Sequence, residues 1–392
     1  MTNSHSCRAC GAPGVIEIPP PHPSRSMVSD GRVIAAPLAR VSCPACGYGA
    51  RLETVSEADR DVLYDGNYGL GLQDAVADEQ RASAYADHIL AAIAHHGSDA
   101  ASLQSIVEFG CGTGALLDAI ITRAPTRQAL GIEPAAQLAA VAQARLQDRA
   151  VVFEGYAETV LPQSSNASLC YSVNVIEHAL DPTQFFAAGC KAISEDGFVV
   201  TICPDGESAG SELLFFDHIS SFSLESLCQF AGRAGLHLRE SKPLGGAQSG
   251  FRLSVFSPQS AKAQSPSLPF DLTAARAAYH RGWRELGEHA AKMPADHGHA
   301  IFGTGEFCDL LHAYAPEFVD NAAFYVVDRP VGEMKFGRTA MSTADFLRDY
   351  RGTPLLAAVH ARSWKQLRAR FAGTSVELKH PFEYCSLRTE LQ

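Results

Sequence analysis

The sequence lacks an excess of positive charge and lacks a long apolar run, and each absence excludes a class of protein. Its 32 lysines and arginines stand against 43 aspartates and glutamates, so the net charge is −11 and nucleic acid is not expected as the main partner. No apolar run approaches the roughly 20 residues that span a bilayer. The opening MTNSHSCRACG is polar and unlike a signal peptide, so we expect a cytoplasmic protein that binds no membrane.

Aromatic residues are also scarce, at 8%, whereas apolar residues make up 46% and charged residues 19% of the 392 positions. This composition is typical of a globular protein and not of a disordered one. The chain is too long for one ordinary core, so two or three domains are expected. Because the expected compartment is reducing, its eleven cysteines favour free thiols and metal ligands over disulfides.

Strands and helices are predicted to alternate between Ile106 and about Phe256. Short apolar runs predict the strands IVEFG, ALGIE, VVFEG, ASLCYSVN, GFVVTIC and FRLSVF. Helix-length segments lie between them: LLDAIITRA, AAQLAAVAQARL, PTQFFAAGCKAI and LESLCQFAGRAG. This alternation predicts an α/β fold with a doubly wound sheet.

The domain boundaries are predicted from breaks in these patterns. Residues 257 to 269 are rich in proline and serine and predict a linker. A long amphipathic helix is predicted next, from about Leu272 to Lys292, and further strand and helix patterns indicate a second, smaller α/β unit. We therefore predict a cysteine-bearing domain over 1–72, an α/β core over 73–258 and a C-terminal α/β domain over 270–392.

Four cysteines near the start form two CxxC pairs, each followed by glycine. The pairs are Cys7 with Cys10, and Cys43 with Cys46. Two-residue spacing lets both thiolates of a pair reach one ion, which predicts a zinc ribbon with a tetrahedral four-sulfur zinc site. Free cysteines or a redox pair are the alternative. A closed four-sulfur shell leaves no open position, so this zinc is expected to be structural.

The segment IVEFGCGTGALLDAI, residues 106 to 120, predicts a strand, a glycine turn and a helix. Gly110, Gly112 and Gly114 let the backbone approach a ligand closely beside a helix N-terminus. Glu133 ends the next predicted strand, where an acid can bind both hydroxyls of a ribose. Together these features predict a nucleotide-binding site of the Rossmann type.

These residues resemble the class I S-adenosylmethionine-dependent methyltransferases. The resemblance covers EFGCGTG, Glu133, EGYAE at 154 to 158 and YSVNVIEHALDP at 171 to 182. It implies that Glu108 and the glycine turn hold the methionine part of the cofactor and that Glu133 holds the ribose. It also implies that Tyr156 and Ala157 flank the adenine and that Asn174 closes the pocket. A Rossmann-type domain for another nucleotide is the alternative.

Over nearly the whole chain the order of segments is similar to the zinc-containing sugar C-methyltransferases. The similarity adds DHISSFSLESL and the C-terminal IFGTGEFCDLL and FYVVDRPVGEMKFGRTAMSTADFL. It implies methylation of carbon in a nucleotide-linked keto-deoxysugar, with the nucleotide held by a second, smaller Rossmann-like C-terminal domain. The implied acceptor-binding residues are Tyr64, Tyr68, His178, Gly303, Gly305 and Asp328.

The stretch FFDHISSFS, residues 215 to 223, contains the candidate catalytic residues. The family has a Tyr-x-Glu-His pattern here, and the matching positions are Phe215, Asp217 and His218. Transfer to carbon requires removal of a proton beside a carbonyl, which suits a histidine supported by a carboxylate. We predict His218 as general base and Asp217 as its support. A packed imidazole, or substrate binding without proton transfer, is the alternative.

Other functions stay open. The acceptor could be nitrogen, oxygen or carbon of another small metabolite in natural-product biosynthesis, with the C-terminal domain repurposed. GTGEF favours this alternative, because Glu306 at a helix N-terminus would repel a diphosphate. RNA modification lacks the positive tract it needs. Binding of a nicotinamide cofactor by GTGEF and Asp328 would not explain the methyltransferase motifs. The sequence does not indicate an oligomeric state.

Overall fold

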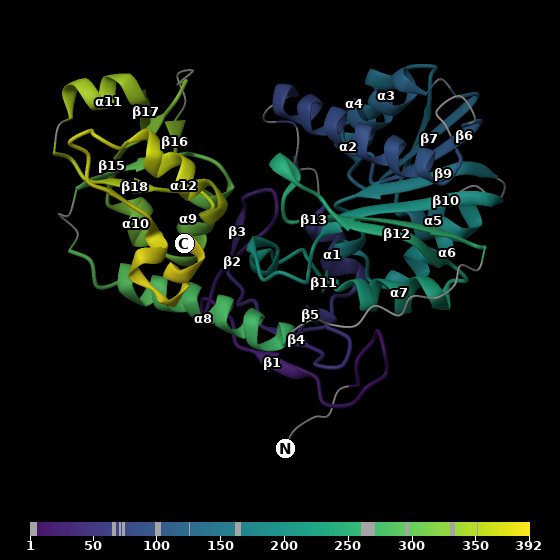
Figure 1. Cartoon of the computed structure of the whole chain (residues 1–392), viewed down its shortest axis with the longest axis horizontal. Coiled ribbons are helices and arrows are strands. Elements are labelled where there is room, and N and C mark those ends of the chain that lie inside the picture. The colour runs from purple at the N-terminus through teal and green to yellow at the C-terminus, as the bar shows by residue number, and fades with distance from the viewer. Residues whose placement is uncertain are drawn as a thin grey trace. The chain divides into compact units, whose positions relative to one another are not determined.

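The structure, a computed structural model, describes residues 6–392 except 65–67, 70–71, 73–74, 99–102, 125, 161–165, 260–270, 295–297, 330–333 and 351. The chain divides into two compact units, and each contains several chain segments (Figure 1). The first unit comprises Met1–Ile16, Val41–Glu212 and Asp217–Thr273. The second comprises Glu17–Arg40, Leu213–Phe216 and Ala274–Gln392. Most of the predicted linker at 257–269 lies outside the described residues.

A seven-stranded sheet forms the centre of the first unit, in the order β12-β13-β10-β9-β6-β7-β8. Its strands are β6 (Ser105–Phe109), β7 (Gln128–Glu133), β8 (Val151–Glu154), β9 (Ala167–Val173), β10 (Ile193–Pro204), β12 (His237–Pro243) and β13 (Phe251–Ser257). β6 to β10 are parallel, and β13 runs antiparallel between β10 and β12. The chain moves outward from β6 in both directions, so a topological switch point lies between β6 and β9.

Helices cover both faces of this sheet (Figure 1). They are α2 (Ala75–His95), α3 (Ala115–Arg123), α4 (Ala136–Leu146), α5 (Ala157–Val160), α6 (Pro182–Ala192) and α7 (Leu224–Arg233). Side chains alternate along β6, so Ile106 packs with α2 and α3, whereas Val107 and Phe109 pack with α6 and α7. Because both faces are covered, the inner strands are buried almost continuously. The α/β core predicted over 106–256 is confirmed.

Local sequence sets the helix starts near the strand ends. Asp181 accepts a hydrogen bond from the Thr183 N–H, and Pro182 occupies the first turn of α6. Ser223 caps α7 in the same way, accepting from the Ser226 N–H at 3.1 Å. The cap at Ser223 ends the irregular segment that contains His218, so this histidine lies in a loop between β10 and α7.

Short elements precede the core. They are β1 (Ile16–Ile18), β4 (Arg40–Ser42), β5 (Gly49–Arg51) and α1 (Glu57–Leu63). The chain leaves the first unit within β1 and returns to it within β4. β5 pairs antiparallel with β11 (Ser220–Ser221), which ties the region after the second cysteine pair to the loop of His218.

The second unit has its own six-stranded sheet, in the order β16-β17-β15-β14-β18-β19. Its strands are β14 (His299–Phe302), β15 (Ala322–Val327), β16 (Met334–Lys335), β17 (Arg338–Ser342), β18 (Leu355–Ala357) and β19 (Leu378–Lys379). The helices are α8 (Leu272–Ala290), α9 (Glu306–Tyr314), α10 (Pro316–Asp320), α11 (Thr343–Asp349) and α12 (Ala361–Arg370). A small hairpin, β2 (Ser26–Met27) with β3 (Val33–Ile34), also belongs to this unit.

Among the helices of the described residues, none is both long enough and apolar enough to cross a bilayer. The α8 helix matches the predicted amphipathic helix and begins at Leu272 as expected. The predicted domain boundaries and the zinc ribbon stay predictions.

Candidate functional site

The glycine turn after β6 has the backbone conformation that its sequence predicts. Gly110, Gly112 and Gly114 all have positive φ angles, of 69°, 52° and 77°. A Cβ on Gly110 would collide with the side chain of Val175, and one on Gly114 would lie 3.1 Å from the Ala142 backbone. Around Gly112 a Cβ would meet open space. The turn therefore packs tightly at both ends and leaves its middle free for a ligand.

Glu133, at the end of β7, holds this turn in place. Its carboxylate accepts one hydrogen bond from the Gly112 N–H and another from the Ala135 N–H, each at 2.9 Å. The side chain is 5% exposed, and burial raises its pKa although these two bonds act in the opposite direction. Each carboxylate oxygen has lone pairs left, so Glu133 can accept further hydrogen bonds from a ligand.

Glu108 lies on β6 just before the turn. It is buried, and the Tyr171 hydroxyl donates to its carboxylate at 3.2 Å. Burial raises the pKa of Glu108 well above its ordinary value. A buried acid beside an open glycine turn is suited to binding a cationic or N–H-bearing group.

Asn174 follows β9, the strand on the other side of the topological switch point. Its φ angle is 56°, and its N–H donates to the Ile202 carbonyl at 2.8 Å. The amide Oδ1 is buried and has no hydrogen-bond partner among the described residues. Ligands of open parallel sheets bind beyond the carboxyl ends of the strands at such a point. Asn174 therefore presents an unused acceptor where a ligand is expected.

Tyr156 and Ala157 follow β8 and are covered by α1. The Arg60 guanidinium lies 3.3 Å from the centre of the Tyr156 ring, and the Tyr156 hydroxyl donates to Asp61 at 2.9 Å. Ala157 is buried. No sequence motif indicated Arg60 or Asp61 as site residues. The capping box of Ser56 predicts the helix but says nothing about what the helix covers.

The candidate catalytic residues come together in the loop after β10. The rings of His178 and His218 lie 4.8 Å apart, edge to face, and the ring of Tyr64 lies 6.0 Å from that of His178. Asp217 accepts a hydrogen bond from His178 Nδ1 through its backbone carbonyl, at 2.9 Å, and its carboxylate lies 3.7 Å from the same nitrogen. Asp217 thus contacts His178, a contact that the motif alone did not predict.

Glu177 was not predicted as a site residue. Its carboxylate and the imidazoles of His178 and His218 each place one atom within 4.8 Å of the others. Glu177 is 1% exposed, and neither carboxylate oxygen has a hydrogen-bond partner among the described residues. Burial raises its pKa to about 8. The only sequence signal for Glu177 is the dipeptide EH. That dipeptide does not indicate whether the Glu177 side chain lies on the same side of the chain as the histidines.

The two predicted acceptor tyrosines lie between these groups. Tyr64 and Tyr68 pack edge to face, with ring centres 4.8 Å apart. Tyr68 packs against Ala135 and Leu138, next to Glu133, while Tyr64 lies near His178. Burial, together with nearby acidic groups, raises the pKa of Tyr64 well above its ordinary value. The two tyrosines therefore connect the predicted cofactor-binding residue Glu133 with the predicted acceptor-binding residue His178.

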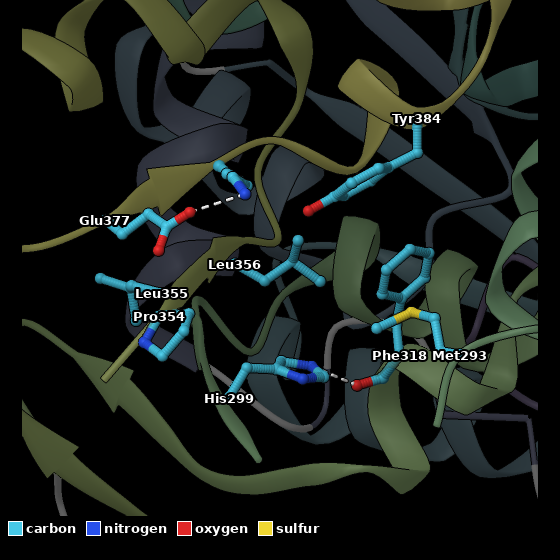
Figure 2. Close-up of a pocket in the computed structure, with 9 residues that line it drawn as sticks. Met293, His299, Phe318, Pro354, Leu355, Leu356, Glu377 and Tyr384 are labelled. Atoms are coloured by element: carbon cyan, nitrogen blue, oxygen red, sulfur yellow. Dashed lines mark hydrogen bonds and ion pairs between the residues drawn. The ribbon is translucent and has the colours of Figure 1, made fainter. Parts of the chain in front are cut away.

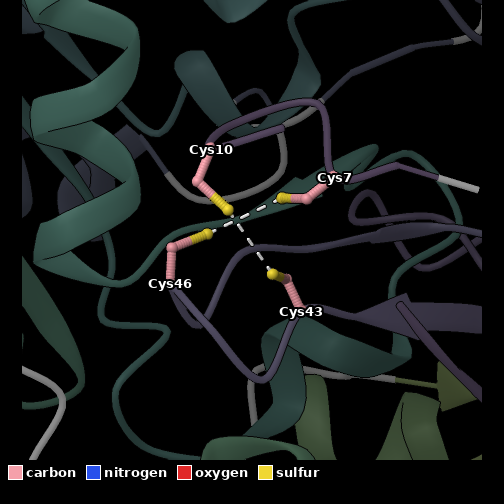
Figure 3. A group of neighbouring side chains, drawn as sticks. All are labelled: Cys7, Cys10, Cys43 and Cys46. Carbon is pink, nitrogen blue, oxygen red and sulfur yellow. Dashed lines mark hydrogen bonds between the residues drawn. The ribbon is translucent and has the colours of Figure 1, made fainter. Parts of the chain in front are cut away.

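The four N-terminal cysteines converge on one point from two loops (Figure 3). Cys7 Sγ lies 3.6 Å from Cys46 Sγ, and Cys10 Sγ lies 3.7 Å from Cys43 Sγ, so none of these pairs is a disulfide. In both loops the N–H of the following glycine donates to the carbonyl of the first cysteine. The hydrogen bond with Cys46 lowers the pKa of Cys7. The cluster has the ligand set of a metal site.

In the second unit, Gly303, Gly305 and Asp328 lie beyond the carboxyl ends of β14 and β15. Gly303 has a φ angle of 96°, and Gly305 precedes α9. The carboxylate of Asp328 accepts hydrogen bonds from both terminal nitrogens of Arg370, at 2.8 and 2.5 Å, and from Thr343. These bonds lower the pKa of Asp328. The predicted ribose acid is therefore already engaged by an arginine.

A cavity of about 80 Å³ lies elsewhere in the same unit, at the amino ends of the strands (Figure 2). His299 begins β14 and Leu355 begins β18, and both line it together with Phe318 and Tyr384. None of the predicted acceptor residues lines this cavity.

A family model described as a methyltransferase domain matches residues 77–241. No curated protein matches the chain. Solved structures with similar folds include three methyltransferases. An S-adenosylmethionine-dependent methyltransferase from Clostridium acetobutylicum ATCC 824 is 10% identical, with a TM-score of 0.38 and coverage of 48% of this chain and 94% of that one.

The other two are O-methyltransferases. NcsB1 from neocarzinostatin biosynthesis, in complex with S-adenosylmethionine and 2-hydroxy-5-methyl naphthoic acid, is 24% identical with a TM-score of 0.36. The mitomycin 7-O-methyltransferase MmcR is 19% identical with a TM-score of 0.37. Each match covers 41% of this chain and 50% of the other, so the chain spans about half their length. Likenesses this distant carry no argument about the acceptor.

The family match runs from α2 into β12 and so includes the glycine turn, Glu133 and Asn174. Residues 77–241 are a methyltransferase domain with a Rossmann-like core. The chain therefore carries a methyltransferase domain.

Proposed function

We propose that this protein is an S-adenosylmethionine-dependent methyltransferase and that it methylates a carbon beside a carbonyl in a small molecule, a nucleotide-linked keto-deoxysugar, with His218 as general base. One observation supports this most: His218 lies against His178 in a buried group at the carboxyl end of the sheet. Such a group is suited to receiving a proton from a weak carbon acid, because neutral imidazole is the base available near pH 7.

The residues around the turn fit the cofactor. S-adenosylmethionine supplies an electrophilic methyl group on a sulfonium ion. Glu133 would accept hydrogen bonds from its ribose, while Glu108 and the turn of Gly110, Gly112 and Gly114 would hold the methionine part. Tyr156 and Ala157 would flank the adenine. The unused Oδ1 of Asn174 and the open space at Gly112 are what such a ligand requires.

The acceptor would lie beside Tyr64, Tyr68 and His178. His218 would remove the carbon proton while the substrate is held in line with the methyl group. Asp217 would act through His178: its carbonyl requires a proton on His178 Nδ1, which orients the ring and leaves Nε2 as an acceptor. Asp217 is therefore proposed as a positioning residue for the second histidine.

We also propose that the four cysteines hold a structural zinc ion. A tetrahedral site with Zn–S bonds of about 2.3 Å spaces its sulfurs by about 3.8 Å. The distances of 3.6 and 3.7 Å agree with this spacing. Zinc would thus join two loops that are 32 residues apart in sequence, from residue 11 to 42, and would take no part in methyl transfer.

A second candidate is methylation of nitrogen, oxygen or carbon in another small metabolite of natural-product biosynthesis. The engagement of Asp328 by Arg370 favours it, because a ribose would have to share an acid that is already paired. Glu306 at the start of α9 also lies 3.1 Å from His360, so a phosphate there would meet a carboxylate. In this case Gly303, Gly305 and Asp328 would have no nucleotide to bind.

The test of the base is His218→Asn. With a nucleotide-linked keto-deoxysugar as acceptor, we expect turnover to be abolished while the Kd for S-adenosylhomocysteine stays within a few-fold of wild type. His237→Asn, at an exposed position on β12, is the matched control and should leave both unchanged. Full turnover by His218→Asn would refute the proposed role of His218 as general base.

The test of the acceptor class is calorimetric. Protein saturated with S-adenosylhomocysteine is titrated with thymidine, uridine and guanosine diphosphates. Tight binding of one of them, weakened by Asp328→Asn, is the expected result for a nucleotide-linked acceptor. If none binds, the second candidate function takes its place.

A further inference from the structure

Glu177, His178 and His218 form a group whose composition the proposed base does not explain. Each contributes one ligand-type atom, and these atoms lie within 4.8 Å of one another. Two imidazoles and one carboxylate are a recurrent ligand set for divalent transition ions. Proton removal by His218 requires only one of the three.

Glu177 has a buried carboxyl group that makes no side-chain hydrogen bond within the described part of the chain. It is 1% exposed, and neither oxygen has a hydrogen-bond partner among the described residues. Buried carboxylates are normally paired, hydrogen-bonded or bound to a metal, because desolvation without compensation is unfavourable. Two imidazoles, which are metal ligands when neutral, lie next to Glu177, and the acidic groups of Glu212 and Asp217 are also close.

His178 is already oriented as a metal ligand would be. Its Nδ1 hydrogen is donated to the Asp217 carbonyl at 2.9 Å, because a carbonyl can only accept. In the neutral ring, Nε2 then carries the lone pair. Histidines that bind metals typically donate the other ring N–H to a carbonyl or carboxylate in this manner.

The spacing of the two rings also agrees with a shared ion. With metal–nitrogen bonds of about 2.1 Å, two imidazoles on one ion have ring centres roughly 5 Å apart. The rings of His178 and His218 lie 4.8 Å apart at an interplanar angle of 89°.

We propose that Glu177, His178 and His218 bind a divalent transition ion such as Zn²⁺, Co²⁺ or Ni²⁺, and that the metal-bound enzyme is inactive. Binding would displace the proton of the buried Glu177 carboxyl group and give the resulting carboxylate a cationic partner. It would also occupy the lone pair of His218, which then cannot accept a proton. The metal site stands on geometry alone, whereas the loss of activity rests on the proposed function of His218.

The experiment uses full-length protein whose cysteine cluster has first been loaded with one equivalent of zinc. Calorimetric titration with Co²⁺ should show one further site in the wild type. Glu177→Gln keeps the shape of the side chain but removes the charged ligand, and it should weaken this site at least about tenfold. His178→Asn should do the same and serves if the first variant does not fold.

The matched control is a second group of the same composition near the surface. His95, His96 and Glu240 also lie within 4.8 Å of one another. Glu240→Gln should leave the titrated site unchanged. Co²⁺ affinity that is unchanged in both Glu177→Gln and His178→Asn, or lost in Glu240→Gln, would overturn the proposed site.

The activity measurement separates the two halves of the proposal. In the wild type, Co²⁺ should inhibit methyl transfer with a midpoint at the Kd from calorimetry, and Glu240→Gln should be inhibited equally. If Co²⁺ stimulated methyl transfer, the proposal that the metal-bound enzyme is inactive would be wrong. If metal-free His218→Asn keeps full turnover, the proposed base fails while the metal titration still decides the site.

Discussion

At the scale of single residues, Glu133 connects the glycine turn after β6 to the segment that follows β7. Its carboxylate accepts hydrogen bonds from the Gly112 N–H, 21 residues earlier in the sequence, and from the Ala135 N–H. The sequence predicted an acid at the end of this strand from its spacing to the glycines. It could not predict that the same acid also supports the turn, because that depends on the side-chain rotamer in the folded protein.

Glu133→Gln should therefore weaken cofactor binding. An amide can accept through one atom only, so one of the two backbone N–H groups loses its partner and the turn loosens. We expect the Kd for S-adenosylhomocysteine to rise at least about tenfold, or about 1.4 kcal/mol. Glu154→Gln, at an exposed position ending β8, is the control and should bind as wild type does. An unchanged Kd in Glu133→Gln would contradict the assigned role.

Glu177 makes the stability of the protein depend on pH. Burial raises its folded-state pKa from 4.5 to about 8, and Glu212 and Asp217 contribute to the rise. Between these values the folded state holds a proton that the unfolded state has lost. The free energy of unfolding should then fall as pH rises from about 5 to about 8, by up to about 1.4 kcal/mol per pH unit from this group.

Glu177→Gln removes this titration and should flatten that part of the profile. Urea unfolding of both proteins at pH 5.5, 6.5 and 7.5, with metal limited to the cysteine cluster, measures it. The expected result is a variant that gains stability relative to wild type as pH rises. If the free energies of unfolding of the two proteins changed in parallel with pH, the burial of Glu177 would have to be compensated by other groups in the folded protein.

Residues in recognisable motifs were predicted, and residues that depend on tertiary contact were not. The glycines, Glu108, Asn174 and His218 belong to patterns that can be read along the chain. Arg60 reaches Tyr156 from a helix almost a hundred residues away, and no local pattern encodes that approach. Roles for the predicted residues remain proposals, since only the methyltransferase domain itself is established.

At the scale of elements, the two cysteine loops and α7 form one structure. Ser223 caps α7 and also donates its hydroxyl hydrogen to the Cys46 carbonyl at 2.5 Å. Tyr48 shares a hydrogen bond of 2.8 Å with Ser220, in the strand that pairs with β5. The cysteine region is thus joined to the loop that leads from His218 to α7.

Removal of the proposed zinc should loosen these elements first. We expect a chelator to increase hydrogen exchange in residues 7–12, 43–51 and 220–226 before it affects β6 and β9. Cys7→Ser should reduce bound zinc below one equivalent and lower the free energy of unfolding. A chelator that stops methyl transfer without changing exchange in these segments would contradict a structural role.

At the scale of the whole molecule, the order of the chain does not follow the two units. Residues 17–40 and 213–216 belong with the C-terminal segment, although the sequence analysis assigned them to the first two domains. The buried guanidinium of Arg40 donates to the carbonyls of Leu213 and Phe215 within the second unit. A change in composition along the chain can predict a linker. The interleaving of the two units depends instead on contacts between segments that are distant in sequence, so no local sequence pattern indicates it.

The central claim, that His218 removes a proton from carbon, can be measured apart from methyl transfer. The enzyme, saturated with S-adenosylhomocysteine, is incubated in D₂O with a nucleotide-linked keto-deoxysugar, and the hydrogens beside the carbonyl are followed by NMR. Our account predicts that the wild type exchanges one of these hydrogens for deuterium and that His218→Asn does not. Exchange that persists in His218→Asn, or methyl transfer by the wild type to oxygen or nitrogen with no exchange, would contradict it.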